Sequence, residues 1–149
     1  MIIAVDFDGT IVEHRYPKIG EERPFATDTL KMLIKDKHQL ILWTVREGEL
    51  LDEAIEWCRK RGVEFWATNR DYPEEDREKN QHFSRKLKAD MFIDDRNIGG
   101  LPDWGTIYQM ITQRKTWDDL FNEVESGRMH MSTHRHSKEK EKKKRWWQF

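Results

Sequence analysis

Acidic residues stand directly after two short apolar runs of the chain. Asp6 and Asp8 follow Ile2–Val5, in the order Asp-Phe-Asp-Gly-Thr, and Asp94 and Asp95 end a later run. Three or four carboxylates at one place repel one another unless a cation lies among them. Hard oxygen ligands select a hard cation, and Mg²⁺ is typically held by one or two carboxylates, water and a phosphate oxygen. The acidic residues therefore predict a Mg²⁺ site.

A phosphoryl group is the substrate that suits such a site. Asp6 could attack phosphorus and form an aspartyl-phosphate, which is a known covalent strategy. Asp8, two residues on, could protonate the leaving oxygen and later deprotonate the water that hydrolyses the intermediate. Mg²⁺ and a cationic side chain would be needed, because one anion otherwise repels another. Lys86 stands shortly before the last apolar run, and its spacing to Asp94 favours it over two basic neighbours.

Two further residues offer hydrogen bonds to phosphoryl oxygens. Thr44 follows the second apolar run and carries a hydroxyl donor. Gly9 suits a tight turn that aims the backbone N–H groups after Asp6 inward. We expect both residues to bind the phosphoryl group.

The elements that must position these residues follow from hydrophobic patterning. The apolar runs are Ile2–Val5, Leu40–Trp43, Val63–Ala67 and Met91–Ile93. They are β-branched or aromatic and do not alternate, which is typical of strands buried on both faces. Helical spacing lies between them, so the alternation predicts an open, mostly parallel α/β sheet. Ligands bind outside the carboxyl ends of such strands, where the polar residues would meet if these strands are neighbours.

These residues together resemble a known family. In order and spacing, the sequence Asp6-Phe7-Asp8-Gly9-Thr10, then Thr44, Lys86 and Asp94-Asp95, resembles the four motifs of the haloacid dehalogenase (HAD) superfamily of phosphohydrolases. The first motif is specific, whereas the others are strong only in combination. The resemblance covers residues 1 to about 112.

The resemblance implies both a fold and a set of roles. The fold would be a three-layer Rossmann-like (HAD-like) α/β fold, with a mostly parallel central sheet and helices on both faces. Asp6 would be the nucleophile and Asp8 the general acid/base, and Mg²⁺ would bind Asp6, the Asp8 backbone carbonyl, and Asp94 or Asp95. Thr44 and Lys86 would be phosphate ligands.

Family members often carry a cap domain, for which this chain has little room. Residues 11–39 can hold only a flap, which we place at residues 11–24, and one helix. Residues 45–85 are largely taken up by a helix, a strand and a connecting loop. We therefore expect no separate cap domain. Capless members resemble enzymes acting on large substrates, or homo-oligomers in which a neighbouring subunit supplies the lid.

His14, Arg15 and Arg46 are candidate contacts for the leaving group because of their positions in the chain. A guanidinium group such as that of Arg46 can make bidentate bonds to phosphate or carboxylate. The alternative is a solvated surface side chain, which carries equal weight for Arg46 and is favoured for the other two.

Charge divides the chain. Residues 127–149 hold eight Lys or Arg and two Glu, whereas the whole chain has a net charge of −1, so residues 1–126 carry −7. We expect a HAD-like phosphohydrolase domain at 1–126 and a basic, polar tail at 127–149 that is helical or partly disordered. An acidic body is a poor generic nucleic-acid binder.

Composition also bears on the compartment. The single cysteine, Cys58, excludes an intrachain disulfide. No apolar run approaches the ~20 residues of a membrane helix. We expect no signal peptide, because Ile2–Val5 follows Met1 without a charged leader. We expect a cytoplasmic protein with no membrane partner.

The sequence thus predicts a Mg²⁺-dependent phosphomonoester hydrolase whose partner is a small phosphorylated substrate. One alternative is a phospho-accepting, receiver-like signalling module. In receiver domains, however, the acceptor Asp ends a middle strand. Here the third apolar run ends in Ala67-Thr68 and offers no Asp. Another alternative is a nucleic-acid end-processing phosphatase that uses the tail, against which the acidic body argues.

Overall fold

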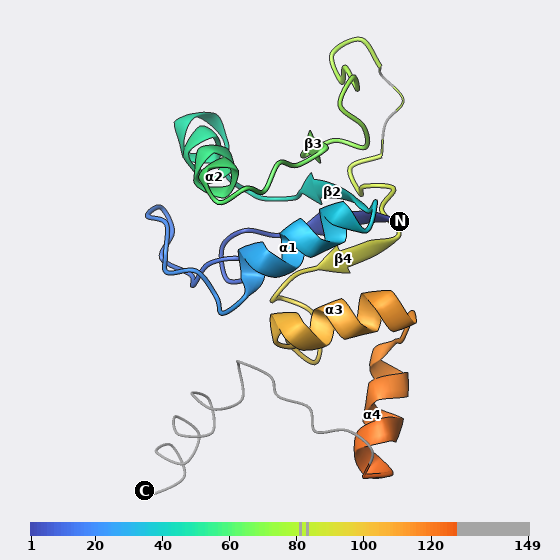
Figure 1. Ribbon diagram of the computed structural model, residues 1–149. Coiled ribbons are helices and arrows are strands. Elements are labelled where there is room, and N and C mark those ends of the chain that lie inside the picture. Colours follow the sequence, from blue (N-terminus) through green and yellow to red (C-terminus); the bar gives the residue numbers. More distant parts are fainter. Residues whose placement is uncertain (81, 83, 128–149) are drawn as a thin grey trace, which may run out of the picture. The chain divides into compact units, whose positions relative to one another are not determined.

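The computed structural model describes residues 1–80, 82 and 84–127 (Figure 1). The chain divides into two units, with the boundary between Asp95 and Arg96. The predicted division into residues 1–126 and 127–149 stays a prediction. The predicted tail lies, from residue 128 on, outside the described residues. In chain order the elements are β1 (Ile2–Val5), α1 (Ala26–Lys35), β2 (Gln39–Leu42), α2 (Gly48–Lys60), β3 (Ala67–Thr68), β4 (Met91–Ile93), α3 (Trp104–Gln113) and α4 (Trp117–Glu125).

The first unit is built on a four-stranded sheet in the order β3-β2-β1-β4, and each neighbouring pair is parallel. The last residue of β1, Val5, pairs with Leu42 of β2 and with Ile93 of β4. These three strands therefore end side by side. The predicted Rossmann-like α/β fold is confirmed, and no cap domain is evident among the described residues.

The third strand differs from its prediction. The apolar run Val63–Ala67 was expected to form it, but β3 covers only Ala67–Thr68. Val63 is buried, yet its N–H donates to the carbonyl of Cys58, which belongs to the end of α2. The first residue of the apolar run is therefore hydrogen-bonded to the end of α2 and not to a neighbouring strand. An apolar sequence indicated burial here, but it did not indicate where strand pairing begins.

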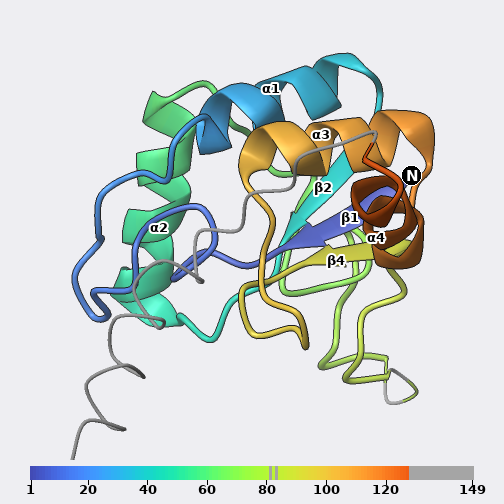
Figure 2. The ribbon, with the colours of Figure 1, turned by 90° about the horizontal axis from the view of Figure 1, so that it is seen from below.

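The two faces of the sheet are covered differently. Figure 2 shows α1 on one side of the strands and the segment between β3 and β4 on the other. On that second side Leu87 joins a buried cluster with Ala4, Ile41 and Ala67. Five partly buried apolar residues pack against this cluster: Ile2, Trp43, Trp66, Ala89 and Phe92. An irregular segment, in which the described residues form no helix, thus covers this face.

The flap forms a short hairpin-like return. Val12 bridges to Asp8 in parallel fashion and to Glu22 in antiparallel fashion. The N–H of Glu13 also donates to the carbonyl of Glu21 at 2.8 Å. Both ends of the flap are therefore held beside the end of β1.

The described part of the second unit, residues 96–127, contains two helices whose starts are capped. The Asp103 side chain accepts a hydrogen bond from the N–H of Thr106 at the start of α3. Thr116 and Asp119 form a reciprocal capping box at the start of α4. None of the described helices has the length and apolar character needed to cross a membrane.

Candidate functional site

Three carboxylates meet at the carboxyl edge of the sheet. Asp6 follows β1, and its N–H donates to the carbonyl of Ile93, the last residue of β4, at 2.9 Å. Asp94 and Asp95 follow directly. One carboxylate oxygen from each of the three aspartates lies within 4.8 Å of the other two. The structure therefore brings Asp6 of the first predicted motif together with Asp94 and Asp95 of the last.

The surroundings of Asp6 oppose its ionisation. The pKa of this carboxyl is raised from 3.8 to about 7, chiefly by burial and next by the charge of Asp94, with a smaller contribution from Asp95. The N–H of Phe7 and the hydroxyl of Thr10 act in the opposite direction but do not offset the burial. A cation beside Asp6 would restore the charged form of this carboxylate.

Thr10 links two members of the cluster. Its hydroxyl donates to Oδ2 of Asp6 at 3.3 Å and accepts the N–H of Asp95 at 3.1 Å, and the residue is completely buried. No role was assigned to Thr10 from the sequence. Its position directly after Gly9 could have marked it, because a turn at Gly9 brings residue 10 back toward Asp6.

Gly9 is required by a close approach to Asp95. Its φ is +87°, and a Cβ added there would lie 2.6 Å from Oδ2 of Asp95. The N–H of Gly9 donates to the carbonyl of Val12 at 2.8 Å. The tight turn expected at Gly9 is thus present, and this N–H has a protein acceptor.

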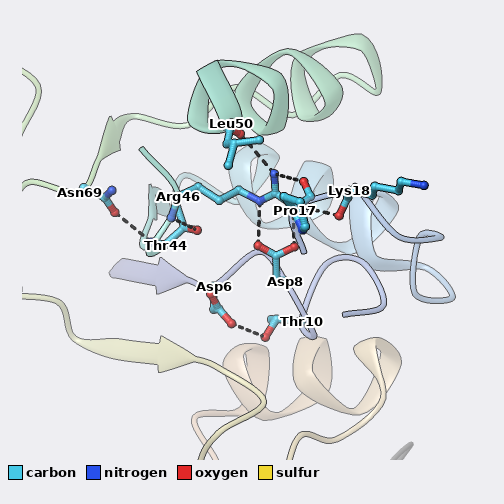
Figure 3. A network of polar contacts seen from close by, with 9 residues as sticks. All are labelled: Asp6, Asp8, Thr10, Pro17, Lys18, Thr44, Arg46, Leu50 and Asn69. Carbon is cyan, nitrogen blue, oxygen red and sulfur yellow. Dashed lines mark hydrogen bonds and ion pairs between the residues drawn. The ribbon is translucent and has the colours of Figure 1, made fainter. Parts of the chain in front are cut away.

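Asp8 lies outside the cluster and pairs with Arg46. The guanidinium donates from Nε to Oδ2 of Asp8 at 2.7 Å and from Nη2 to Oδ1 at 2.8 Å. Figure 3 shows the Asp8 side chain directed toward Arg46, whereas that of Asp6 is directed toward Thr10. Arg46 is only 1% exposed. Of the two alternatives that carried equal weight for Arg46, the solvated surface side chain is therefore wrong.

The other bonds of Arg46 tie Asp8 to the flap and to α2. Nη1 donates to the carbonyls of Pro17 and Leu50 at 3.2 and 3.3 Å, and Nη2 donates to that of Lys18 at 3.1 Å (Figure 3). The hydrogen bonds to Asp8 are the main reason why the pKa of Arg46 is raised above its ordinary value. Arg46 therefore stays charged at the centre of this network.

Thr44 is held at the end of β2 by two hydrogen bonds. Its N–H donates to Oδ1 of Asn69 at 2.9 Å, and its hydroxyl oxygen accepts the N–H of Arg46 at 3.1 Å (Figure 3). Asn69 follows β3 in a left-handed backbone conformation, with φ of +52°. Asn adopts that conformation more readily than most residues, which was the signal that could have marked Asn69.

Lys86 and His14 lie apart from these contacts. Lys86 is exposed, and its ammonium nitrogen lies 5.9 Å from the centroid of the Phe92 ring. Phe92 packs against the buried cluster that includes Leu87, the residue next to Lys86. His14 is exposed in the flap, and the preceding prediction of a solvated side chain agrees with that.

Comparison with known proteins gives one clear relationship. No family model and no curated protein matches this chain. A solved structure of a conserved protein from Bacteroides thetaiotaomicron is similar, with 69% sequence identity and a TM-score of 0.75. The match covers 81% of this chain and 97% of the other. The chain therefore belongs to the same family as this conserved Bacteroides thetaiotaomicron protein.

Proposed function

We propose that the protein is a Mg²⁺-dependent phosphomonoester hydrolase of the HAD type, in which Asp6 is the nucleophile and the substrate is a small phosphorylated molecule. The observation that carries the proposal is the approach of Asp6, Asp94 and Asp95, with carboxylate oxygens within 4.8 Å of one another at the carboxyl ends of β1 and β4. This is the edge at which ligands of open parallel sheets bind.

The donor set fits a hard divalent cation. All three side chains offer carboxylate oxygens, the ligand type that Mg²⁺ prefers. Their mutual repulsion, which adds to the larger effect of burial on the pKa of Asp6, would be relieved by a bound cation. Asp6 and one or both of Asp94 and Asp95 would hold the ion, together with the Asp8 backbone carbonyl implied by the family resemblance. When bound, Mg²⁺ would neutralise charge on the phosphoryl oxygens.

The residues of the chain would then act in two steps. In the first, a carboxylate oxygen of Asp6 forms a bond to phosphorus while the ester P–O bond breaks, and Asp8 gives a proton to the leaving oxygen. In the second, Asp8 takes a proton from the water that attacks phosphorus, and the bond between Asp6 and phosphorus breaks. Each Asp8 oxygen accepts one N–H from Arg46, which leaves further lone pairs for the proton.

Phosphate release from 4-nitrophenyl phosphate tests the proposal. We expect turnover with Mg²⁺, none in EDTA, and a loss of roughly 10³-fold or more in Asp6→Asn, because the nucleophile is removed. Asp28→Asn is a matched control, since Asp28 is an exposed carboxylate of α1 paired with Lys31. Full activity in EDTA would contradict the proposal. A single phosphorylation without steady turnover would instead favour the receiver-like module.

A further inference from the structure

The guanidinium of Arg46 has no donor left for a substrate in this structure. An arginine side chain carries five N–H donors. Five hydrogen bonds leave Arg46: two go to the carboxylate of Asp8 and one each to the carbonyls of Pro17, Lys18 and Leu50. A direct contact between Arg46 and a phosphoryl or leaving group would require some of these bonds to break.

The same five bonds join three segments that are separate in the sequence. Asp8 follows β1, Pro17 and Lys18 belong to the flap, and Leu50 lies in the first turn of α2. The ring of Phe7 lies 5.2 Å and that of Tyr16 lies 5.3 Å from the guanidinium carbon. These contacts restrict where the Asp8 carboxylate can point.

We infer that Arg46 is a positioning residue, which holds the Asp8 carboxylate and the flap in the arrangement needed for proton transfer. The inference rests on the proposed function, because Asp8 transfers a proton only if the protein cleaves phosphate esters. A bidentate, charge-assisted pair fixes the plane of the carboxylate as well as its distance. Lysine cannot reproduce this geometry, because an ammonium group lacks the planar fork.

The test compares two substrates that differ in their need for a proton. An alkyl phosphate has a poor leaving group and needs protonation, whereas 4-nitrophenyl phosphate releases a stable phenolate. In Arg46→Gln we expect kcat/KM to fall by roughly 10²-fold or more for the alkyl phosphate, since that is the usual contribution of general acid–base catalysis. The fall should be at least tenfold smaller for the aryl phosphate, and Arg46→Lys should restore only part of the loss.

A double variant separates positioning from substrate binding. If Arg46 acts through Asp8, then adding Arg46→Gln to Asp8→Asn should change kcat/KM by less than about threefold, because the interaction is already gone. This double variant also removes both buried charges together. Arg46→Gln alone could fail to fold. In that case two comparisons still test the inference: Asp8→Asn with the double variant, and Arg46→Lys with the wild type.

Arg59→Gln provides the matched control. Arg59 makes a similar two-bond pair with Glu56, at 2.8 and 2.9 Å, but on the exposed surface of α2. It should leave both substrates unaffected. Equal losses on both substrates in Arg46→Gln, or a full further loss in the Asp8→Asn background, would overturn the inference and leave the proposed function standing. Absence of Mg²⁺-dependent turnover in the wild type would overturn both.

Discussion

At the scale of single residues, Asp6 combines burial with the charges of two neighbouring aspartates. These effects raise its pKa to about 7. A carboxylate nucleophile must be ionised to attack phosphorus. Without a bound cation, these surroundings would leave Asp6 largely protonated below neutral pH. The requirement for a metal is thus expected to follow from the folded environment of one carboxylate as well as from the needs of the substrate.

This pKa predicts how stability depends on pH. In EDTA, the folded protein keeps a proton on Asp6 between pH 4 and pH 7, whereas the unfolded chain, with a pKa of 3.8, has released it. The folded state binds more protons in this window, so the contribution of Asp6 is fully present below pH 4 and is lost as pH rises to about 7. The loss should be on the order of a few kcal/mol.

Urea unfolding in EDTA at pH 5 and pH 7.5 measures the effect. Asp6→Asn should lack this part of the pH dependence, because its amide does not titrate. Added Mg²⁺ should stabilise the wild type more at pH 7.5 than at pH 5, since the ion competes with the proton. The same difference between the two pH values in wild type and variant would contradict the assignment of the raised pKa to Asp6.

Gly9 gives a second prediction at this scale. Gly9→Ala should destabilise the protein by about 2–4 kcal/mol, from left-handed strain of about 1 kcal/mol and a methyl group forced against Asp95. Gly99→Ala is the matched control. Its φ of +93° is similar, but none of the described atoms lies within 4 Å of its added Cβ, so strain alone should remain. Urea unfolding of both variants, with and without added Mg²⁺, compares their losses in free energy of unfolding. Equal losses would show that the close approach of Asp95 does not restrict residue 9.

At the scale of elements, the register of the sheet positions the acidic cluster. Val5 of β1 pairs with Ile93 of β4, so the residues that follow both strands are neighbours although they lie almost ninety positions apart in the sequence. All residues of the candidate site lie within Met1–Asp95, whereas α3 and α4 belong to the second unit. Changes within α4 should therefore affect stability without affecting the chemistry.

The capping box of α4 tests this separation. Thr116→Ala removes the side chain that accepts from the N–H of Asp119, and should cost about 1 kcal/mol of stability. Thr116→Ser keeps the hydroxyl and should cost less. Phosphate release per folded molecule should be unchanged in both variants. A loss of turnover that exceeds the loss of folded protein would show that α4 contributes to the site.

At the scale of the whole molecule, charge is distributed unevenly along the chain. Residues 1–126 carry −7 and residues 127–149 carry +6. We expect deletion of 128–149 to leave turnover of 4-nitrophenyl phosphate unchanged, because the candidate site lies elsewhere in the chain. The acidic body also predicts no preference for end-phosphorylated oligonucleotides over small phosphates. A preference that weakens steeply with salt and disappears on deletion would support the nucleic-acid alternative.

The sequence by itself determined the α/β architecture and the meeting of Asp6 with Asp94 and Asp95. The physical reason is that buried parallel strands are recognisable from continuous apolar runs, and their carboxyl ends share one edge. The position of an acidic residue directly after such a run can therefore be predicted even when the path of the following loop is unknown. The same logic extends to Thr44, which the structure also places at the end of β2.

Only the tertiary structure decided the partners of side chains carried by loops. Asp8 and Arg46 are 38 positions apart, and their pairing depends on the path of the flap, which supplies two carbonyls to the same guanidinium. Lys86 lies beside Phe92 because Leu87 anchors its segment on one sheet face. Neither arrangement leaves a periodic pattern in the sequence, since irregular backbone is positioned by individual long-range contacts and not by repeated local ones.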